Sequence, residues 1–227
     1  MKVSVVIPAY NEEKYIKKCL VSVTNQVVPA DEIVVVNNNS TDKTVAIAKK
    51  FEVKIINEKK QGMTPARNKG FNEAKYEIIA RCDADCIVPP DWIKIIKDNF
   101  EKRKIDALSG PVFFYDSKFL KKTSTIPSHL ALESLKILSK GKRHLVGPNM
   151  SLTKKIWNKV KSHVTVDDSK VHEDMDLSLN IAKIGGKTEY DPDLIVGISA
   201  RRLKNSPESF FLEYPIRMVK TFWFNKK

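Results

Sequence analysis

The sequence predicts an α/β protein with a mainly parallel sheet and helices on both of its faces. Short β-branched runs alternate with longer amphipathic stretches through the first hundred residues. Each run is bounded by proline, asparagine or aspartate, which is typical of a buried strand. Polar segments follow each run directly. A chain that alternates strand and helix in this way favours parallel pairing with helical crossovers.

The first half contains four expected strands and four expected helices. The strands are residues 3–7, closed by Pro8, and residues 33–36, 53–56 and 77–81. Asn11 is the expected N-cap of a helix that Glu12 and Glu13 open. The second helix is expected over residues 43–51. Thr64 and Pro65 predict an N-cap followed by proline at the first helical position, and Pro89-Pro90 introduces a helix that carries Trp92.

The second half is less regular. A strand is expected over residues 106–114 and an amphipathic helix over 127–139. Gly147-Pro148-Asn149 predicts a turn, and residues 173–184 predict a helix that ends at Gly185-Gly186. We expect one domain over residues 1–203, divided into residues 1–110 and 111–203, followed by a C-terminal segment (204–227).

The composition excludes several classes of protein. The chain has 227 residues, 40 Lys and Arg against 27 Asp and Glu, and a formal net charge of +13, which favours anionic partners. No run of like charges is long enough for a nucleic-acid-binding tail. Three cysteines without a CxxC pair favour a reducing compartment. The sequence predicts neither a signal peptide nor a span of about 20 apolar residues, so we expect a cytoplasmic protein.

The polar segments after the four strands should meet at one edge of the sheet, because ligands of parallel α/β sheets bind beyond the carboxyl ends of the strands. Asp83-Ala84-Asp85 comes directly after the fourth strand. Two carboxylates two residues apart in an extended chain point the same way, with Cα atoms about 6–7 Å apart. Such a pair is suited to Mg²⁺ or Mn²⁺; an acidic pair in a solvated turn is the alternative.

A second acidic cluster, Glu173, Asp174 and Asp176, begins the helix expected at 173–184. It could supply a general base that takes a proton from an acceptor hydroxyl, or the residues could only cap the helix. Glu173 and Asp176 should share one helix face, with Asp174 turned away. Arg67, near the start of the third helix, could bind a diphosphate or lie at the surface.

Together these segments resemble the family 2 glycosyltransferases. The opening motif matches residues 8–13 (Pro-Ala-Tyr-Asn-Glu-Glu), and residues 34–42 match the second strand with its polar turn. Residues 62–70 match the next block, and Asp83-Ala84-Asp85 matches the metal motif. Gly147-Pro148-Asn149 resembles the acceptor-side turn and Glu173-Asp174 the base motif. The resemblance extends over about residues 3–200.

The resemblance implies a GT-A fold, with a Rossmann-like nucleotide-sugar-binding half (1–110) and an acceptor-binding half (111–203). It also implies an inverting, metal-dependent transfer of a sugar. Pro8, Tyr10 and Glu12 would line the nucleotide pocket, Asn37 and Asn38 would hold the base, and Arg67 the diphosphate. Asp83 and Asp85 would hold Mn²⁺ or Mg²⁺. Asp174 would be the catalytic base, with Asn149 and Glu173 on the acceptor side. The donor would be a nucleotide-diphosphate sugar, with UDP first and GDP next, and the acceptor a glycan or a polyprenyl-linked glycan.

The sequence departs from the family pattern at two places. Asn37-Asn38-Asn39 stands where relatives usually carry aspartates, and asparagine can donate as well as accept. No histidine appears near residues 197–199, where many relatives have a metal ligand. The metal is therefore expected to have few protein ligands and to bind together with the nucleotide. His172 could tune the base or simply flank the helix cap.

The C-terminal segment carries an aromatic stripe. Phe210, Tyr214, Met218 and Phe222 recur every four residues, with Phe211, Val219 and Trp223 adjoining them and Arg217 and Lys220 nearby. Such a pattern predicts either an interfacial helix at the cytoplasmic face of a membrane or a stripe that packs on the domain. Pro215 should interrupt or kink the helix.

Two other functions remain open from the sequence. The Asn37–Asn39 departure would suit a non-catalytic protein that still binds nucleotide sugars. The net charge alone would suit a nucleic-acid-binding protein, but no recognition motif supports it, so no nucleic-acid partner is expected.

Overall fold

The computed structural model describes residues 1–117, 141, 143–205 and 214–225. A seven-stranded sheet forms its centre, in the order β3-β2-β1-β4-β7-β5-β8. The strands are β1 (Val3–Ala9), β2 (Glu32–Asn37), β3 (Lys54–Asn57), β4 (Ile78–Arg81), β5 (Ala107–Ser109), β7 (Met150–Thr153) and β8 (Thr188–Tyr190). β3, β2, β1 and β4 are parallel, whereas β7 runs antiparallel to both of its neighbours. The prediction of a mainly parallel α/β sheet is confirmed.

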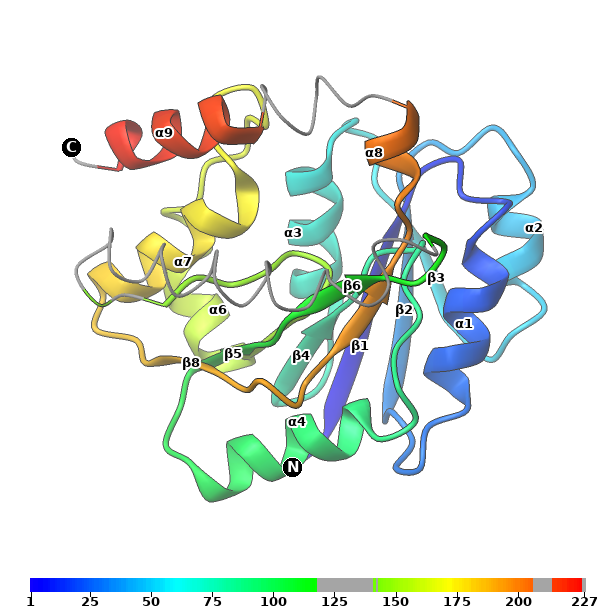
Figure 1. Cartoon of the computed structure of the whole chain (residues 1–227), viewed down its shortest axis with the longest axis horizontal. Coiled ribbons are helices and arrows are strands. Elements are labelled where there is room, and N and C mark those ends of the chain that lie inside the picture. Colours follow the sequence, from blue (N-terminus) through cyan, green and yellow to red (C-terminus); the bar gives the residue numbers. More distant parts are fainter. Residues whose placement is uncertain (118–140, 142, 206–213, 226–227) are drawn as a thin grey trace.

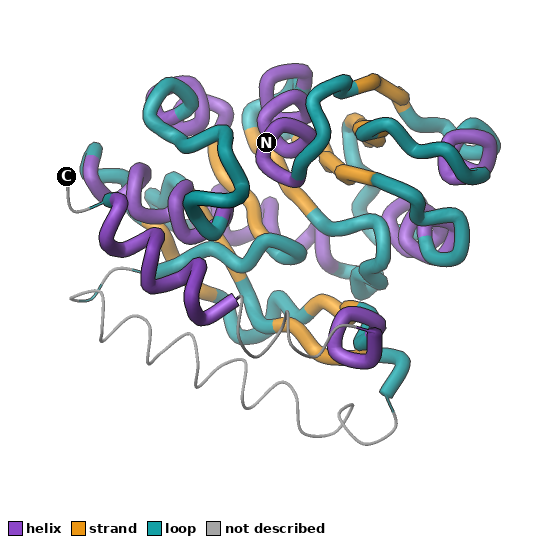
Figure 2. Tube along the Cα trace, turned by 90° about the horizontal axis from the view of Figure 1, so that it is seen from above, coloured by secondary structure: helices purple, strands orange, loops and turns teal. Residues whose placement is uncertain are grey.

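Helices cover both faces of this sheet (Figures 1 and 2). α1 (Ile16–Thr24), α2 (Thr44–Ala48) and α4 (Trp92–Lys102) contribute to one apolar core, together with Val5 and Ile7 of β1. α3 (Met63–Glu73), α6 (Lys154–Val160) and α7 (Glu173–Lys183) form the other, with Val6 of β1. Residues of β1 therefore alternate between the two cores, as the two-residue period of a strand requires.

α3 packs closely against the sheet at Gly70. A Cβ atom at this position would lie 2.3 Å from Cγ1 of Val6 and 2.9 Å from Cγ2 of Val36. Both valines are fully buried in neighbouring strands, so neither can move away easily. The close approach brings the first turn of α3 to the carboxyl ends of β1 and β2.

The sequence placed two helix starts wrongly. α1 begins at Ile16 and not after Asn11, because Asn11 has a φ of 53° and its carboxamide oxygen accepts the N–H of Thr41 at 2.8 Å. α3 begins at Met63 after Gly62, so Thr64 and Pro65 lie inside its first turn. The cap comes from elsewhere in the chain, because the Asp168 carboxylate accepts the N–H of Thr64 at 3.1 Å.

The expected strand at 106–114 is two strands in two sheets. β5 belongs to the central sheet, whereas β6 (Val112–Phe114) pairs with β9 (Val196–Ile198) in a separate two-stranded sheet. The chain changes sheets at Gly110-Pro111. A Cβ at Gly110 would lie 2.0 Å from the carbonyl oxygen of Leu194, so the crossing requires glycine. The expected turn at Gly147-Pro148-Asn149 is confirmed by the bridge between Val146 and Asn149.

Two helices complete the described chain, α8 (Arg201–Asn205) and α9 (Tyr214–Phe224). Both lie at the edge where the parallel strands end, at the top of Figure 1. Pro215 does not kink α9, because it lies in the first turn, where a missing N–H leaves no helical bond unmade. The helix expected at 127–139 and most of the aromatic stripe fall outside the described residues. Among the helices that are described, none is long and apolar enough to cross a membrane.

Candidate functional site

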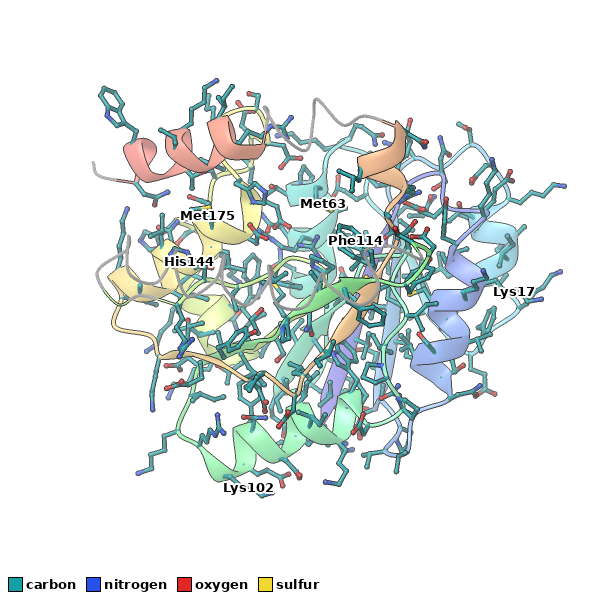
Figure 3. The ribbon with its side chains drawn as sticks, in the orientation of Figure 1. Lys17, Met63, Lys102, Phe114, His144 and Met175 are labelled. Carbon is teal, nitrogen blue, oxygen red and sulfur yellow. The ribbon has the colours of Figure 1, made fainter. Side chains whose placement is uncertain are left out.

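Two adjoining cavities lie beyond the carboxyl ends of the parallel strands. The larger has a volume of about 380 Å³ and the smaller about 180 Å³. Met63, Asp83 and Asp85 line both cavities. Figure 3 shows Met63 and Phe114, which both line the larger cavity, near the centre of the molecule, whereas Lys17 and Lys102 point outward.

Four residues predicted for the nucleotide site line the smaller cavity: Pro8, Tyr10, Glu12 and Asn38. Pro8 and Tyr10 come from the end of β1, and Asn38 from the end of β2. The β1 loop is tied to the β2 loop, since the backbone N–H of Glu12 donates to Thr44 Oγ1 at 2.7 Å. The structure thus brings together residues that are up to thirty positions apart, as parallel strands predict.

The amides of Asn37 and Asn38 are already engaged within the protein. Both N–H groups of the Asn38 carboxamide donate to backbone carbonyls, those of Glu58 at 2.9 Å and Lys60 at 2.8 Å, and its oxygen accepts the N–H of Gly62 at 2.9 Å. An aspartate could not donate to these carbonyls. Asn38 therefore fixes the loop before α3. Asn37 donates to Asn57, and it is not among the residues lining the two cavities.

Asp83 and Asp85 are each paired with an arginine. β4 ends at Arg81, and the following turn closes with a hydrogen bond of 3.0 Å from the N–H of Cys86 to the carbonyl of Asp83. Arg81 donates to Asp83 Oδ1 at 2.9 Å, and Nε of Arg201 donates to Asp85 Oδ2 at 2.9 Å. The two aspartates therefore face the shared wall of the two cavities with opposite charges beside them.

The carboxylate oxygens around Asp85 fit the ligands of a divalent cation that also binds a phosphate. Oxygen is the ligand that Mg²⁺ and Mn²⁺ prefer, and Asp83, Asp85 and Glu12 all line the smaller cavity. Glu12 Oε2 is buried without a hydrogen-bond partner. Burial raises the pKa of Glu12 despite the adjacent Arg201. Among the described residues, no three acidic, histidine or cysteine side chains are grouped so that they could hold a metal ion.

Glu173 bridges two buried arginines at the start of α7. Its carboxylate accepts from Arg81 on one side and from Arg67 on the other, and Arg67 also donates to the Glu173 carbonyl at 2.7 Å. Arg67 is completely buried and is not among the residues lining the two cavities. In this arrangement it supports Glu173, and a direct contact with a diphosphate would require a change of partner.

Asp174 lies beside Glu173 and lines the larger cavity. Its Oδ2 accepts the N–H of Gly147 at 2.9 Å, and its Oδ1 accepts the N–H of Met175 at 2.7 Å and pairs with Nδ1 of His172. Burial alone would raise the pKa of Asp174. The charge and hydrogen bond of His172, the Gly147 N–H and the charge of Arg81 outweigh burial, so the pKa lies well below its ordinary value.

His172 does not cap the helix with its side chain. Burial would lower its pKa, but the charge and hydrogen bond of Asp174 raise it above the ordinary value of 6.5. The partner of His172 is thus Asp174, the residue expected to be the base, as the interpretation that His172 tunes the base requires.

The acidic cluster divides differently from the sequence-based expectation. Glu173 and Asp174 both reach the larger cavity, and Asp176 does not. Asp176 is buried against the loop before α7 and against α9, where it accepts from the N–H of Thr165 at 2.7 Å and from Asn225 at 2.9 Å. Glu173 and Asp174 are the first two residues of α7, and both side chains line the cavity although they are consecutive in the helix.

Asn149 is not among the residues lining the two cavities, and its side chain binds other segments of the protein. Its carboxamide donates to the carbonyls of Pro111 at 3.1 Å and Leu194 at 2.6 Å and accepts the indole N–H of Trp92 at 3.1 Å. It is fully buried. Asn149 therefore holds the acceptor-side turn in place, while Gly147 and Pro148 line the larger cavity.

Sequence reasoning missed three arginines: Arg81, Arg201 and Arg217. Arg81 lies at the end of an expected strand, where a charged residue beside an acidic motif could have indicated pairing. Arg201 and Arg217 come from distant helices at the same edge of the sheet and line the smaller and the larger cavity, respectively. No local pattern in the sequence points to either of them.

Comparison with known proteins identifies the family of the chain. The family model described as Glycosyl transferase family 2 matches residues 4–160. The chain therefore belongs to glycosyl transferase family 2.

Two curated relatives and one solved structure illustrate the similarity. Glycosyltransferase AglE of Haloferax volcanii is 36% identical over 120 residues, which cover 49% of this chain and 40% of that protein. An uncharacterized glycosyltransferase of Methanocaldococcus jannaschii is 29% identical over 240 residues, covering 99% of this chain and 80% of the relative. The mannosyltransferase PcManGT of Pyrobaculum calidifontis, in complex with GDP-Man and Mn²⁺, superposes with a TM-score of 0.76 at 20% identity, covering 97% and 63% of the two chains.

The structural similarity identifies the fold as GT-A, as the resemblance implied. The first curated relatives are longer proteins: the matches cover 40%, 28% and 17% of their lengths.

The pairing of His172 with Asp174 makes the stability of the protein depend on pH. Because the folded-state pKa of His172 is raised, its contribution is fully present below the ordinary value of 6.5 and is lost as the pH rises through the folded-state value. We expect the difference in free energy of unfolding between wild type and His172→Gln to be larger at pH 6 than at pH 9. Urea denaturation at both pH values measures it.

His163→Gln is the matched control, since His163 is exposed and contacts the neighbouring Ser162. Its difference from wild type should show no such trend. A His172→Gln difference that is constant or grows with pH would contradict the ion pair.

Proposed function

We propose that the protein is a metal-dependent, inverting glycosyltransferase that moves a sugar from a nucleotide diphosphate to an acceptor hydroxyl. The observation that carries the proposal is the shared wall of the two cavities. The donor would occupy the smaller cavity and the acceptor the larger one, so that Asp83 and Asp85 lie between the two substrates. Membership of glycosyl transferase family 2 supports this reaction class.

The donor would bind with its nucleotide against Pro8, Tyr10 and the loop that Asn38 holds. Asp83 and Asp85 would hold Mg²⁺ or Mn²⁺, which would stabilise the charge developing on the leaving diphosphate. The mannosyltransferase of similar fold was solved with GDP-Man and Mn²⁺, so GDP is to be tested beside UDP. Which nucleobase binds depends on backbone groups as well as on Asn38, because the Asn38 amide protons are already donated within the protein.

Asp174 is a better candidate for the base than Glu173. Both are carboxylates in the larger cavity, but Glu173 is held by two arginines, which remain charged at any pH that the protein tolerates. The partner of Asp174 is a histidine, which can lose its proton. As His172 becomes neutral, Asp174 loses the adjacent positive charge and becomes more basic. Asp174 can then take the proton of the acceptor hydroxyl while the hydroxyl attacks the sugar.

The acceptor we propose is a glycan carried on a lipid, bound at a membrane surface through α9. One side of α9 is fixed to the domain: Thr221 is fully buried and its Oγ1 accepts the N–H of His172 at 2.6 Å. The other side is apolar and exposed. Ile216, Val219 and Trp223 have exposed fractions of 53, 67 and 73% and are spaced three and four residues apart, as on one helix face.

This exposed face fits the surface of a bilayer that contains anionic lipids. Lys220 is exposed on the same helix, and the chain has a net charge of +13. Arg217 of α9 lines the larger cavity, so the helix that would rest on the membrane also borders the proposed acceptor site. α9 would thus fit both interpretations of the C-terminal segment, packing on the domain and binding a membrane: its polar side lies on the domain and its apolar side faces outward.

Removing the base should abolish turnover and leave donor binding intact. We expect Asp174→Asn to lower kcat by about 10²–10⁴-fold, as for other general bases. Its affinity for the matching nucleotide diphosphate with Mn²⁺ should stay within about two-fold of wild type, because Asp174 lines only the larger cavity. Sugar-nucleotide consumption and calorimetric titration measure the two quantities.

Asp91→Asn is the control, because Asp91 is an exposed aspartate at the start of α4, away from both cavities. It should behave as wild type. Full turnover by Asp174→Asn would refute the assignment of the base.

Membrane binding should depend on the exposed face of α9. We expect the triple variant Ile216→Ser, Val219→Ser, Trp223→Ser to lose most of its flotation with vesicles that contain anionic lipid, because the buried apolar area is removed. Substitution is preferable to deletion, since the deletion would also remove the Thr221 contact with His172.

Val27→Ser is the control, because Val27 is 69% exposed on a loop elsewhere. It should float as wild type does. Flotation that the triple variant retains in full would reject a membrane contact through α9.

A further inference from the structure

Arg201 of α8 reaches across the site to the opening motif. Its Nε donates to Asp85 Oδ2 at 2.9 Å, and its terminal NH2 nitrogen donates to Glu12. The guanidinium carbon lies 4.6 Å from the centroid of the Tyr15 ring. The charges of Glu12 and Asp85 raise the pKa of Arg201 although burial opposes this. One guanidinium thus joins Glu12 and Asp85, which lie 189 and 116 positions before Arg201 in the chain.

The pairing leaves the smaller cavity with an excess of negative charge. Glu12, Asp83 and Asp85 line it, and Arg201 is the only lysine or arginine among the described residues that do so. Arg81 also pairs with Asp83, but it is not among the residues lining this cavity. Glu12 Oε2 stays buried without a partner, so the two contacts of Arg201 satisfy only part of the carboxylate oxygens. A buried, unsatisfied carboxylate oxygen is costly and marks a place where a cation or donor would bind favourably.

We propose that Arg201 binds the diphosphate of the donor, and that before the donor arrives it takes the place of the cation between Glu12 and Asp85. The inference rests on the proposed donor site in the smaller cavity. A guanidinium has five N–H donors in a planar fork that matches phosphate oxygens, and only two of its nitrogens are used in the contacts with Glu12 and Asp85. When a cation binds Asp85, Arg201 loses one of its two carboxylate partners. The oxygens of the diphosphate can then accept the hydrogen bond that Asp85 accepted.

This exchange makes Arg201 a competitor of the cation and a partner of the donor. Without nucleotide, a cation must displace the guanidinium from Asp85, so Arg201 weakens its binding. With a nucleotide diphosphate, the guanidinium gains two or more charged oxygen acceptors, so Arg201 strengthens the binding of the complex. The two effects have opposite signs. A residue that only stabilised the fold would change both affinities in the same direction.

The test measures both affinities for wild type and Arg201→Gln. Electron paramagnetic resonance of free Mn²⁺ gives the affinity for Mn²⁺ alone, and calorimetry gives the affinities for UDP and GDP in saturating Mn²⁺. We expect Arg201→Gln to bind Mn²⁺ alone several-fold more tightly. We expect it to bind the preferred nucleotide diphosphate about ten-fold more weakly, as for the loss of a hydrogen bond between charged groups. Arg201→Lys should recover part of the nucleotide affinity and serves as the second variant if the glutamine variant does not fold.

Arg143→Gln is the matched control. Arg143 also pairs with a glutamate, Glu189 at 3.9 Å, and also lies over a tyrosine ring, Tyr190 at 5.5 Å, but it is not among the residues lining the two cavities. It should leave both affinities unchanged.

Two results would overturn the inference: an Arg201→Gln variant whose two affinities fall together, or one in which either affinity is unchanged. A wild-type protein that binds neither diphosphate would instead reject the proposed donor site on which the inference rests.

Discussion

Arg81 joins the end of β4 to the start of α7 at the point where the proposed chemistry takes place. Its guanidinium is buried at the end of β4 and donates to Asp83 in the turn that follows and to Glu173 at the start of α7. The carboxylates raise its pKa although burial opposes this. Removing one partner of a buried ion pair costs about 3–5 kcal/mol, because the remaining charge is left uncompensated. The acidic motif and the first turn of α7 are therefore held together around the guanidinium of Arg81. Arg67 adds a further ion pair to Glu173. This constraint fixes the positions of Asp83, which lines both cavities, and of Glu173, which lines the larger one.

Most of the sheet could be predicted from the sequence, because buried strands with a β-branched run leave a clear local pattern. Helix starts were less predictable. The cap of α3 comes from Asp168, which lies a hundred residues away in the chain, and Asn11 binds the neighbouring loop instead of starting α1. The break at Gly110 was also missed, since the apolar residues on its two sides read as one continuous strand. Its cause is the carbonyl of Leu194, which occupies the space of a side chain. Each of these features depends on contacts between distant segments, and no local pattern encodes them.

In the candidate site, too, some features follow from local sequence and others depend on contacts between distant segments. Tyr10, Asp83 and Asp85 each follow a strand closely, and all three line the smaller cavity at the edge where the topology of parallel strands predicts that such segments meet. Asn38 and Asn149 were expected to bind substrate, but in the structure their amides hold loops in place, which the residue type cannot reveal. Arg201 could be assigned its partners only once α8 was placed beside the opening motif. In the proposed function, a cation and a diphosphate would enter the site together. The carboxylates would supply ligands for the cation, and in the structure Arg81 and Arg201 already hold Asp83 and Asp85 in position.

The most direct measurement of this account is a binding panel of UDP, GDP, CDP and dTDP, each with and without Mn²⁺, for wild type and Asp85→Asn. The account predicts that one diphosphate binds preferentially, that its affinity depends on Mn²⁺, and that Asp85→Asn removes this dependence, because Asp85 lines both cavities and would hold the cation. Folded wild-type protein that binds none of the four, or that binds one equally well without metal and with Asp85 replaced, would contradict it.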